Sequence, residues 1–226
     1  MTTELDLAHV LEPDPEPRPG PALEPFIRPY RPSDRAALGD ICVRTAHDGG
    51  DASHLYPDPE LLPAIFAYPY VELEPAFAFV LDDGSGSAVG YVLGVPDTAA
   101  FAGRFRAEWL PGVADRFPAP AGPARTPADG MTGLLYAPER MVRDELAGFP
   151  AHLHIDVLPA WQGRGYGRAL MTTLLEALLR HGVPAVHLCM ARANTPARAF
   201  YDRLGFRLLT VDDPGPVWYL GRPTTP

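Results

Sequence analysis

The chain has 226 residues, and its 46% hydrophobic content suffices for one large globular domain or two small ones. Its formal net charge is −9, and an acidic chain without a basic stripe argues against nucleic acid as the main partner. No apolar run approaches the roughly 18 residues of a membrane span, and the first residues lack the pattern of a secretory signal. We therefore expect a cytoplasmic protein without a membrane partner.

Composition divides the chain into two regions. Residues 1–25 are acidic and rich in alternating prolines, which cannot donate backbone hydrogen bonds, and they predict an extended, mobile leader. Residues 26–226 are expected to form the folded domain. Cys42 and Cys189 lie in apolar segments without the spacing of a metal site, so we expect both to be buried and reduced.

The first elements of the domain alternate between strand and helix. Residues 26–30 predict a strand, and a helix follows with Ser33 or Asp34 as its cap and apolar residues at helical spacing. A polar loop at 47–60 then leads to a short apolar helix near 60–68.

A hairpin and an insert come next. Two β-rich runs, 76–81 and 88–95, flank a cluster of Asp, Gly and Ser, and this pattern predicts an antiparallel pair. Residues 98–117 have helical patterning that we expect Pro111 to interrupt, and 118–130 have the composition of a surface loop.

The second half contains a predicted strand, helix, strand unit, so the fold class is α/β with antiparallel strands in its first half. The elements expected there, in order, are a helix at 134–146, a strand at 151–159, a helix at 166–181, a strand at 185–191, a helix at 195–204 and strands at 207–211 and 217–221.

A glycine-rich turn, QGRGYG at 162–167, connects the strand to the helix that follows. Its spacing does not match the G-x-G-x-x-G of dinucleotide-binding turns, and a Walker A loop requires a lysine that the chain lacks. Because glycines permit close approach, consecutive amides at the helix start can converge on an anion such as a pyrophosphate. Arg164 and Arg168 flank the turn and would add charge-assisted hydrogen bonds.

This turn resembles the signature Q/R-x-x-G-x-G/A of the GNAT family of N-acetyltransferases, which cradles the pyrophosphate of acetyl-CoA. V-x-P at 157–159 stands before it, and ANTPARAFYDRLGF at 193–206 resembles the second signature of the family. Element order agrees over roughly 26–220 and the specific motifs over 151–207. The resemblance implies the GNAT fold, a mixed, mostly antiparallel sheet of about seven strands flanked by helices. It also implies acetyl transfer from acetyl-CoA to a small-molecule or protein amine.

The same resemblance assigns residues to the cosubstrate. Tyr201 is the candidate acid that protonates the leaving CoA thiolate. The implied contacts with acetyl-CoA are Val157, Leu158, Gln162, Gly163, Arg164, Gly165, Tyr166, Gly167, Arg168, Asn194, Arg198 and Tyr201.

Three further stretches, IRPYRPSD, FVLDDG with GYVLG, and EWLP, resemble the acetyltransferase-like C-terminal domain of animal O-GlcNAcases. That domain lacks an intact cofactor loop, whereas this chain has one, which implies a free-standing bacterial relative that binds acetyl-CoA. Two functions stay open, an acetyltransferase and an acetyl-CoA-binding protein without transfer activity. The acceptor and the oligomeric state are not given by the sequence.

The catalytic base is sought in the strand AHLHIDVLP. Alternation places His152, His154 and Asp156 on one face, where titratable groups are costly unless they are hydrogen-bonded or functional. We predict Asp156 as the base or acceptor-binding carboxylate because it adjoins the pantetheine-binding segment, with His154 as second choice and as a substrate contact. A bulge in this strand of the family would shift the alternation by one residue.

Two alternatives concern ligands other than the cosubstrate. The row of two histidines and an aspartate would also suit a metal ion, as in a metal-dependent hydrolase. The loop at 47–54 is where the family usually receives its acceptor, and His47 and Asp48 would favour a cationic or polyhydroxyl group.

Overall fold

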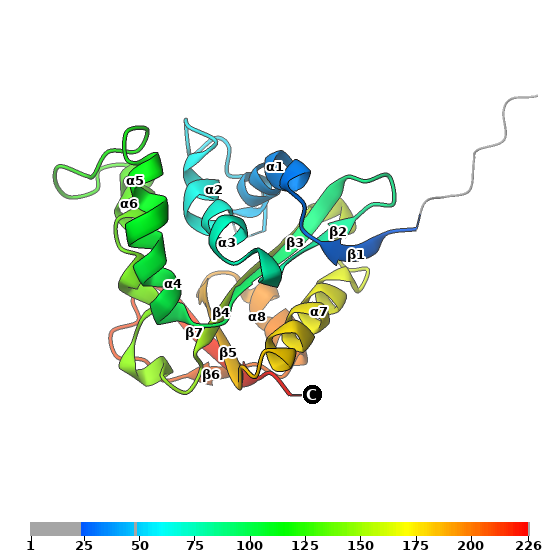
Figure 1. Cartoon of the computed structure of the whole chain (residues 1–226). Coiled ribbons are helices and arrows are strands. Elements are labelled where there is room, and N and C mark those ends of the chain that lie inside the picture. Colours follow the sequence, from blue (N-terminus) through cyan, green and yellow to red (C-terminus); the bar gives the residue numbers. More distant parts are fainter. Residues whose placement is uncertain (1–23, 48, 226) are drawn as a thin grey trace, which may run out of the picture.

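A seven-stranded sheet runs through the molecule in the order β1-β2-β3-β4-β5-β7-β6 (Figure 1). The computed structural model describes residues 24–47 and 49–225, so the predicted leader lies outside the described residues except for its last two. Every neighbouring pair of strands is antiparallel except β4 and β5, which are parallel. The strands are β1 (Phe26–Pro29), β2 (Ala78–Asp82), β3 (Ala88–Val95), β4 (Ala151–Val157), β5 (Ala185–Ala191), β6 (Arg207–Leu209) and β7 (Val217–Pro223). The expected mixed, mostly antiparallel sheet is confirmed.

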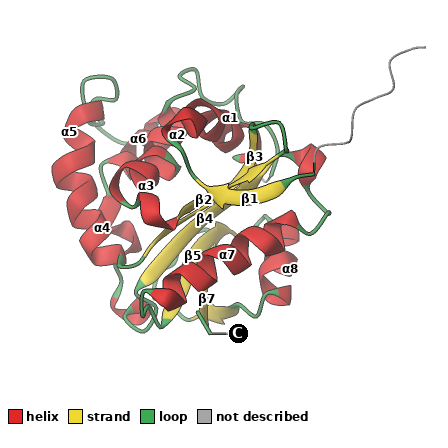
Figure 2. Cartoon of the chain, turned by 45° about the vertical axis from the view of Figure 1, so that its right-hand side comes forward, coloured by secondary structure: helices red, strands yellow, loops and turns green. Residues whose placement is uncertain are grey.

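Helices cover both faces of this sheet (Figure 2). α1 to α6 lie on one face, while α7 and α8 lie on the other. No helix among the described residues combines the length and the apolar character that crossing a bilayer requires. The helices are α1 (Arg35–Thr45), α2 (Leu61–Phe66), α3 (Tyr68–Leu73), α4 (Thr98–Arg104), α5 (Leu110–Val113), α6 (Pro127–Leu135), α7 (Tyr166–Arg180) and α8 (Thr195–Arg203).

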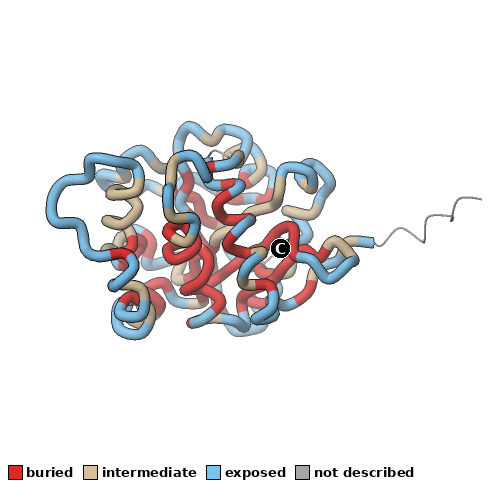
Figure 3. The backbone as a smooth tube through the Cα atoms, turned by 90° about the horizontal axis from the view of Figure 1, so that it is seen from above, coloured by how far each residue is buried: buried red, intermediate tan, exposed pale blue. Residues whose placement is uncertain are grey.

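Strand alternation divides the core into two layers. In β3, Tyr91 and Leu93 belong to the layer under α1, whereas Val92 between them packs in the layer under α7. Helix α7 presents Leu170 and Leu174 to that second layer, one helical turn apart, and both are fully buried. Buried backbone is accordingly concentrated in the middle of the molecule, inside a rim of exposed loops (Figure 3).

The sheet separates between β4 and β5. These two strands pair only at Ala151 with Val186 and at His152 with His187. Beyond that point β4 continues to pair with β3 up to Val157, while β5 pairs only with β7. The two strands therefore diverge, and we call the gap between residues 153–157 and 188–191 the wedge.

Residues 98–117 stay helical past the proline that was expected to interrupt them. A π-helical turn, Phe105–Trp109, links α4 to α5, and Pro111 lies in the first turn of α5. Proline cannot donate to the helix ladder and its ring crowds the carbonyl four residues earlier, so a wider turn before it relieves both problems. The predicted interruption at Pro111 is therefore wrong, because the helix changes to a π-helical turn before the proline and then continues as α5.

Helix α6 starts inside the segment predicted as a loop. Thr126 accepts a hydrogen bond from the Asp129 amide, and the Asp129 carboxylate accepts one from the Thr126 amide. This reciprocal cap, followed by a proline at the first helical position, defines a helix start. The predicted surface loop at 118–130 is thus confirmed only up to its last four residues.

The helix predicted at 134–146 is wrong. α6 ends at Leu135, and the remainder of that segment forms two 3₁₀ turns, Pro138–Met141 and Asp144–Leu146. A proline inside a helical pattern ends the helix before it, and Pro138 has this effect here.

A buried ionic cluster fixes the start of α1. Asp34 occupies the N-cap position that was predicted for Ser33 or Asp34, but its carboxylate makes no capping hydrogen bond within the helix. It accepts instead two hydrogen bonds from the Arg28 guanidinium, at 2.6 and 2.8 Å. Arg28 also donates to Asp82 at 2.7 Å, which ties β1, β2 and the start of α1 together.

Candidate active site

The glycine turn has open space around it and a backbone conformation that favours glycine. Gly163 has φ +72° and Gly165 has φ +88°, values that residues with a side chain rarely adopt. A methyl group added at either position would contact nothing within 4 Å, so backbone conformation rather than crowding requires glycine there. Gly167 differs, because an added Cβ would lie 3.2 Å from the ring of Phe200 on α8.

Six consecutive amides at this turn lack partners. Within the described residues, no acceptor is found for the N–H groups from Gly163 to Arg168, and the first paired amide is that of Ala169, which donates to Gly165 at 3.1 Å. The last three of these six form the first turn of α7, where the helix dipole favours negative charge. An anion with several acceptor oxygens would satisfy them.

Cationic and aromatic side chains surround the turn. Arg164 and Arg168 are exposed and form no ion pair with any described carboxylate. The Arg164 guanidinium lies 5.7 Å from the Trp161 ring, and that ring packs against Tyr166 at 5.9 Å. Two free guanidinium groups beside six free amides make this end of α7 suited to phosphate groups.

The backbone groups that the resemblance assigns to pantetheine lie at the end of β4. The Leu158 amide donates to the Val89 carbonyl at 3.0 Å, and the Gln162 side chain donates to the Val157 carbonyl at 2.8 Å. A carbonyl oxygen accepts two hydrogen bonds, so Val157 keeps one acceptor site. Contact of these residues with a ligand stays a prediction.

The two residues predicted at the start of α8 have partners of their own. The Asn194 side chain caps the helix by accepting from the Ala197 amide at 3.1 Å. Arg198 donates to Asp202 at 2.9 Å and its guanidinium lies 5.2 Å from the Trp218 ring. Both residues thus position α8, and their contact with acetyl-CoA stays a prediction.

Asp156 lies in the wedge and is held by a tyrosine of the neighbouring strand. The Tyr91 hydroxyl donates to Asp156 Oδ2 at 2.6 Å, and His154 Nε2 is 3.7 Å from the same oxygen. Burial raises the pKa of Asp156, although the charge of His154 and hydrogen bonds from Tyr91 and Thr45 oppose this rise. A carboxylate with a raised pKa and one side open to the wedge has the properties of a general base.

Tyr201 faces the same region from α8. Its side chain is buried, and burial together with the charges of Asp156 and Cys189 raises the pKa of its hydroxyl. The hydroxyl therefore stays protonated at neutral pH and is able to donate a proton. Tyr201 packs in the core layer under α7 and α8. That its hydroxyl meets the reacting groups beside Asp156 stays a prediction.

The predicted alternation along β4 is confirmed. His152, His154 and Asp156 pair across the ladder with Val95, Leu93 and Tyr91, so all three lie on the α1 side of the sheet. The bulge expected from the family does not occur in this strand, because its pairing with β3 is continuous, and the one irregular register lies between β2 and β3.

The metal-site alternative finds no support. Both ring nitrogens of His152 have partners, the Tyr70 hydroxyl at 2.9 Å and the Thr98 hydroxyl at 3.0 Å. Burial lowers the pKa of His152 well below its usual value, so the ring is a neutral structural group. The described residues contain no cluster of three or more His, Cys, Asp or Glu side chains placed to hold a metal ion.

Two residues were missed or misjudged from sequence. Tyr91 was missed because it meets Asp156 only through the pairing of β3 with β4, which lie far apart in the chain. Its one signal in the sequence is a hydroxyl within an otherwise apolar strand. Cys189 was expected to be buried, but it is exposed because β4 has diverged from β5 at this level.

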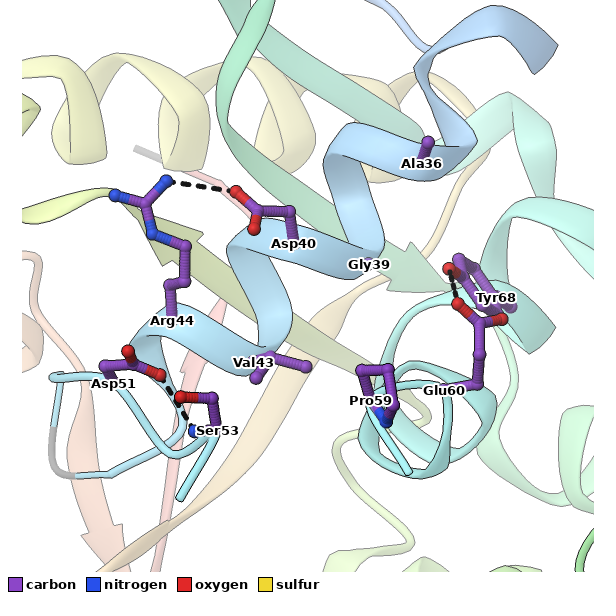
Figure 4. Close-up of a pocket in the computed structure, with 10 residues that line it drawn as sticks. All are labelled: Ala36, Gly39, Asp40, Val43, Arg44, Asp51, Ser53, Pro59, Glu60 and Tyr68. Carbon is purple, nitrogen blue, oxygen red and sulfur yellow. Dashed lines mark hydrogen bonds and ion pairs between the residues drawn. The ribbon is translucent and has the colours of Figure 1, made fainter. Parts of the chain in front are cut away.

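A cavity lies on the other side of α1 (Figure 4). It measures about 450 Å³ and includes the carboxylates of Asp40, Asp51 and Glu60 in its wall. Each carboxylate has a partner: Arg44 at 3.0 Å, the Ser53 amide at 2.8 Å and the Tyr68 hydroxyl at 3.3 Å, respectively. This cavity lies on the face of α1 that is opposite the buried residues Ile41 and Cys42, so it does not open onto Asp156.

The loop at 47–54, which was predicted to receive the acceptor, is described except for one residue. The His47 and His54 rings pack at 5.6 Å, and both residues are exposed. Asp48 lies outside the described residues. A role of this loop in binding an acceptor stays a prediction.

Comparison with known proteins agrees with this geometry. Residues 130–206 match the model of the acetyltransferase (GNAT) family. The chain is 62% identical to the protein in the crystal structure of SsHAT, with 90% of this chain and 100% of that chain covered and a TM-score of 0.87.

Two further proteins are similar to this chain at lower sequence identity. The chain is 27% identical over 200 residues to protein O-GlcNAcase from Rattus norvegicus, which covers 87% of this chain but only 22% of that protein. A GNAT superfamily phosphinothricin acetyltransferase from Sinorhizobium meliloti, solved in complex with AcCoA, shares the fold at a TM-score of 0.54 and 15% identity, with 88% of each chain covered. On the matched segment and the similarity to SsHAT over that protein's full length, the chain belongs to the acetyltransferase (GNAT) family, a family of acyltransferases.

Proposed function

We propose that this protein binds acetyl-CoA and transfers its acetyl group directly to an amine. The observation that carries the proposal is the row of six unpaired amides from Gly163 to Arg168, which ends near a wedge containing Asp156 and Tyr201. Such a row suits a pyrophosphate, and the wedge beside it suits an extended chain that leads away from the phosphates.

The residues of the turn fit the cosubstrate in charge as well as in shape. A pyrophosphate brings two negative charges, and Arg164 and Arg168 supply two cations that no described carboxylate neutralises. Further support comes from the phosphinothricin acetyltransferase of similar fold, which was solved with AcCoA.

The transfer step needs a base on one side of the thioester carbonyl and an acid on the other. The amine nitrogen attacks the carbonyl carbon, Asp156 takes the proton that the nitrogen loses, and the carbon–sulfur bond breaks. Tyr201 then donates its hydroxyl proton to the departing thiolate. The raised pKa of Asp156 matches its role, because it makes the carboxylate a stronger base. Tyr201 is protonated at neutral pH, which is the state that a proton donor needs, while its raised pKa makes it a weaker acid than a free tyrosine.

Two measurements test this function. Calorimetry with acetyl-CoA should show binding, and a thiol assay should show CoA release when a panel of amines is added. Tyr201→Phe should bind acetyl-CoA as the parent does but release CoA about a hundredfold more slowly, because it lacks the proton donor. Tyr136→Phe is the matched control, since its hydroxyl bonds to the Phe117 carbonyl in the α5 to α6 region.

The outcomes separate the alternatives. Absence of acetyl-CoA binding would contradict the whole proposal. Binding without CoA release in the presence of any amine would favour a binding protein without transfer activity. Equal rates for Tyr201→Phe and the parent would remove Tyr201 from the mechanism while leaving the enzyme.

A further inference from the structure

Arg140 lies beside Phe66, which stacks on His154 of β4, and it forms no ion pair with a described carboxylate. It belongs to the 3₁₀ turn Pro138–Met141, between α6 and β4, and its side chain is half-buried. One guanidinium nitrogen donates to the carbonyls of Leu134 and Ala137, both at 3.1 Å, and so caps the end of α6. The neighbouring acid Glu139 is engaged by Arg106 instead, at 2.5 and 2.6 Å. The other two nitrogens of Arg140 have no partner among the described residues.

A row of planar groups connects Arg140 to the predicted base. Its guanidinium lies 5.9 Å from the ring centre of Phe66, at the end of α2. The Phe66 ring stacks on the His154 ring at 5.6 Å with an angle of 27° between their planes. His154 in turn lies beside Asp156. A cation, an aromatic ring, an imidazole and a carboxylate therefore follow one another along one side of the wedge.

The residue that follows Arg140 contacts β5, since the Met141 sulfur lies 3.6 Å from the Cys189 sulfur. Cys189 is exposed at the surface, but the protein atoms packed around its thiol raise the pKa of that thiol, and the charge of Arg140 opposes the rise. Burial lowers the pKa of His152, and Arg140 adds to that effect. The acidic residues of the cavity beside α1, namely Asp40, Asp51 and Glu60, lie on the other side of that helix from Asp156.

We propose that the acceptor is an amine with a carboxylate at its far end, and that Arg140 binds this carboxylate. The inference rests on the proposed acetyl transfer. With the amine at Asp156, an apolar or aromatic spacer would lie along Phe66 and His154, and the two free guanidinium nitrogens would meet the two carboxylate oxygens. The planar fork of arginine matches a carboxylate, whereas lysine would offer only a point charge.

The test compares probes that differ only in charge. With acetyl-CoA present, 4-(aminomethyl)benzoate should be acetylated with a kcat/KM about tenfold to a hundredfold higher than 4-(aminomethyl)benzamide, as expected for a charge-assisted hydrogen-bonded pair. The flexible pair 6-aminohexanoate and 6-aminohexanamide should show the same order. Arg140→Gln should abolish the preference by slowing only the carboxylate probes, and Arg140→Lys should keep part of it.

Controls distinguish a binding role from the capping role. Arg143→Gln changes a nearby arginine whose guanidinium donates to the Asp212 carbonyl, and it should leave the preference intact. Acetyl-CoA affinity should be the same in every variant. Calorimetry on the CoA-loaded protein with each probe gives a second readout that does not depend on turnover.

The opposite results would overturn the inference. If the parent binds and acetylates carboxylate and amide probes equally, or if Arg140→Gln slows both probes alike while lowering the melting temperature, Arg140 only caps α6. Loss of acetyl-CoA binding in the parent would instead contradict the proposed function. Acetylation of other amines without any preference for a carboxylate would contradict this inference alone.

Discussion

At the scale of single residues, the candidate site depends on a carboxylate whose surroundings raise its pKa while one side of the group stays accessible. Asp156 is 18% exposed and accepts a hydrogen bond from Tyr91. Full exposure would return its pKa to the ordinary value of 3.8 and make it a weaker base. Full burial would prevent contact with an amine. Its position in the wedge avoids both.

The pH dependence of transfer should show this base directly. Asp156 must be ionised to accept a proton, so kcat/KM should fall as the pH is lowered through its pKa, which lies above 3.8. Asp156→Asn should lower kcat by about a hundredfold to ten-thousandfold and remove this acidic limb. The raised pKa of Tyr201 means that its hydroxyl adds no alkaline loss below pH 10.

Rates measured across a pH series, with acetyl-CoA affinity and tryptophan fluorescence as controls for binding and folding, check this expectation. An acidic limb with the same midpoint in Asp156→Asn would assign it to another group. His154 would then be the next residue to replace.

Motif positions allowed the residues of the turn, Asp156 and Tyr201 to be proposed from sequence, because a strand, a turn and a helix are local and their spacing is preserved in three dimensions. Tyr91 meets Asp156, and Arg140 meets Phe66, through contacts between segments far apart in the chain. Such contacts depend on strand pairing and on how the insert folds back, and one sequence does not contain that information. The function of each of these residues stays a prediction.

At the scale of elements, the glycine turn and α7 form the part of the site that depends on backbone conformation. Gly165→Ala should reduce acetyl-CoA affinity about tenfold or more, because alanine disfavours φ +88° and the relaxed turn would spread the free amides apart. Gly182→Ala is the matched control at the other end of α7, with φ +75° and equally open surroundings.

Both variants should lose about 1 kcal/mol of unfolding free energy, since both place a side chain in the left-handed region. Calorimetry and thermal unfolding measure the two effects separately. If Gly182→Ala lost as much acetyl-CoA affinity as Gly165→Ala, the effect would come from general destabilisation of α7 and not from the turn.

The elements that sequence patterns predicted well are those with a strong period or clear boundaries, such as α7 and the hairpin of β2 and β3. The insert between β3 and β4 was predicted less well. Its prolines at 111 and 138 have different consequences, since Pro111 begins a helical segment after a π turn whereas Pro138 follows the end of α6. A proline restricts the backbone, but packing decides which permitted conformation the chain takes.

At the scale of the whole molecule, the cluster of Arg28, Asp34 and Asp82 anchors α1 to the edge of the sheet. All three side chains are 6% exposed or less. Burial opposes ionisation of both aspartates, but hydrogen bonds from Arg28 and from backbone amides, together with the charge of Arg28, outweigh it and lower the pKa of each. Because the carboxylates are ionised more readily in the folded state, their contribution to stability is present above pH 3.8 and is lost as the pH falls below it.

Asp34→Asn should therefore lower the unfolding free energy by about 3 kcal/mol at pH 7, since it leaves the buried guanidinium with one charged partner fewer. Asp40→Asn removes an exposed pair on the same helix, with Arg44, and should cost less than about 0.5 kcal/mol. Urea denaturation at pH 7 compares the two. Equal losses would mean that the cluster contributes no more than a surface ion pair.

The brief contact between β4 and β5 has a mechanical consequence. The sheet consists of two panels, β1 to β4 and β5 to β7, and its hydrogen-bonded seam is only two residue pairs long. Relative motion of the panels would be concentrated at that seam, where the rings of His152 and His187 lie 5.9 Å apart. A ligand that contacts both sides of the wedge would hold the two parts of the sheet together. Occupancy of the site and rigidity of the whole sheet would therefore rise together.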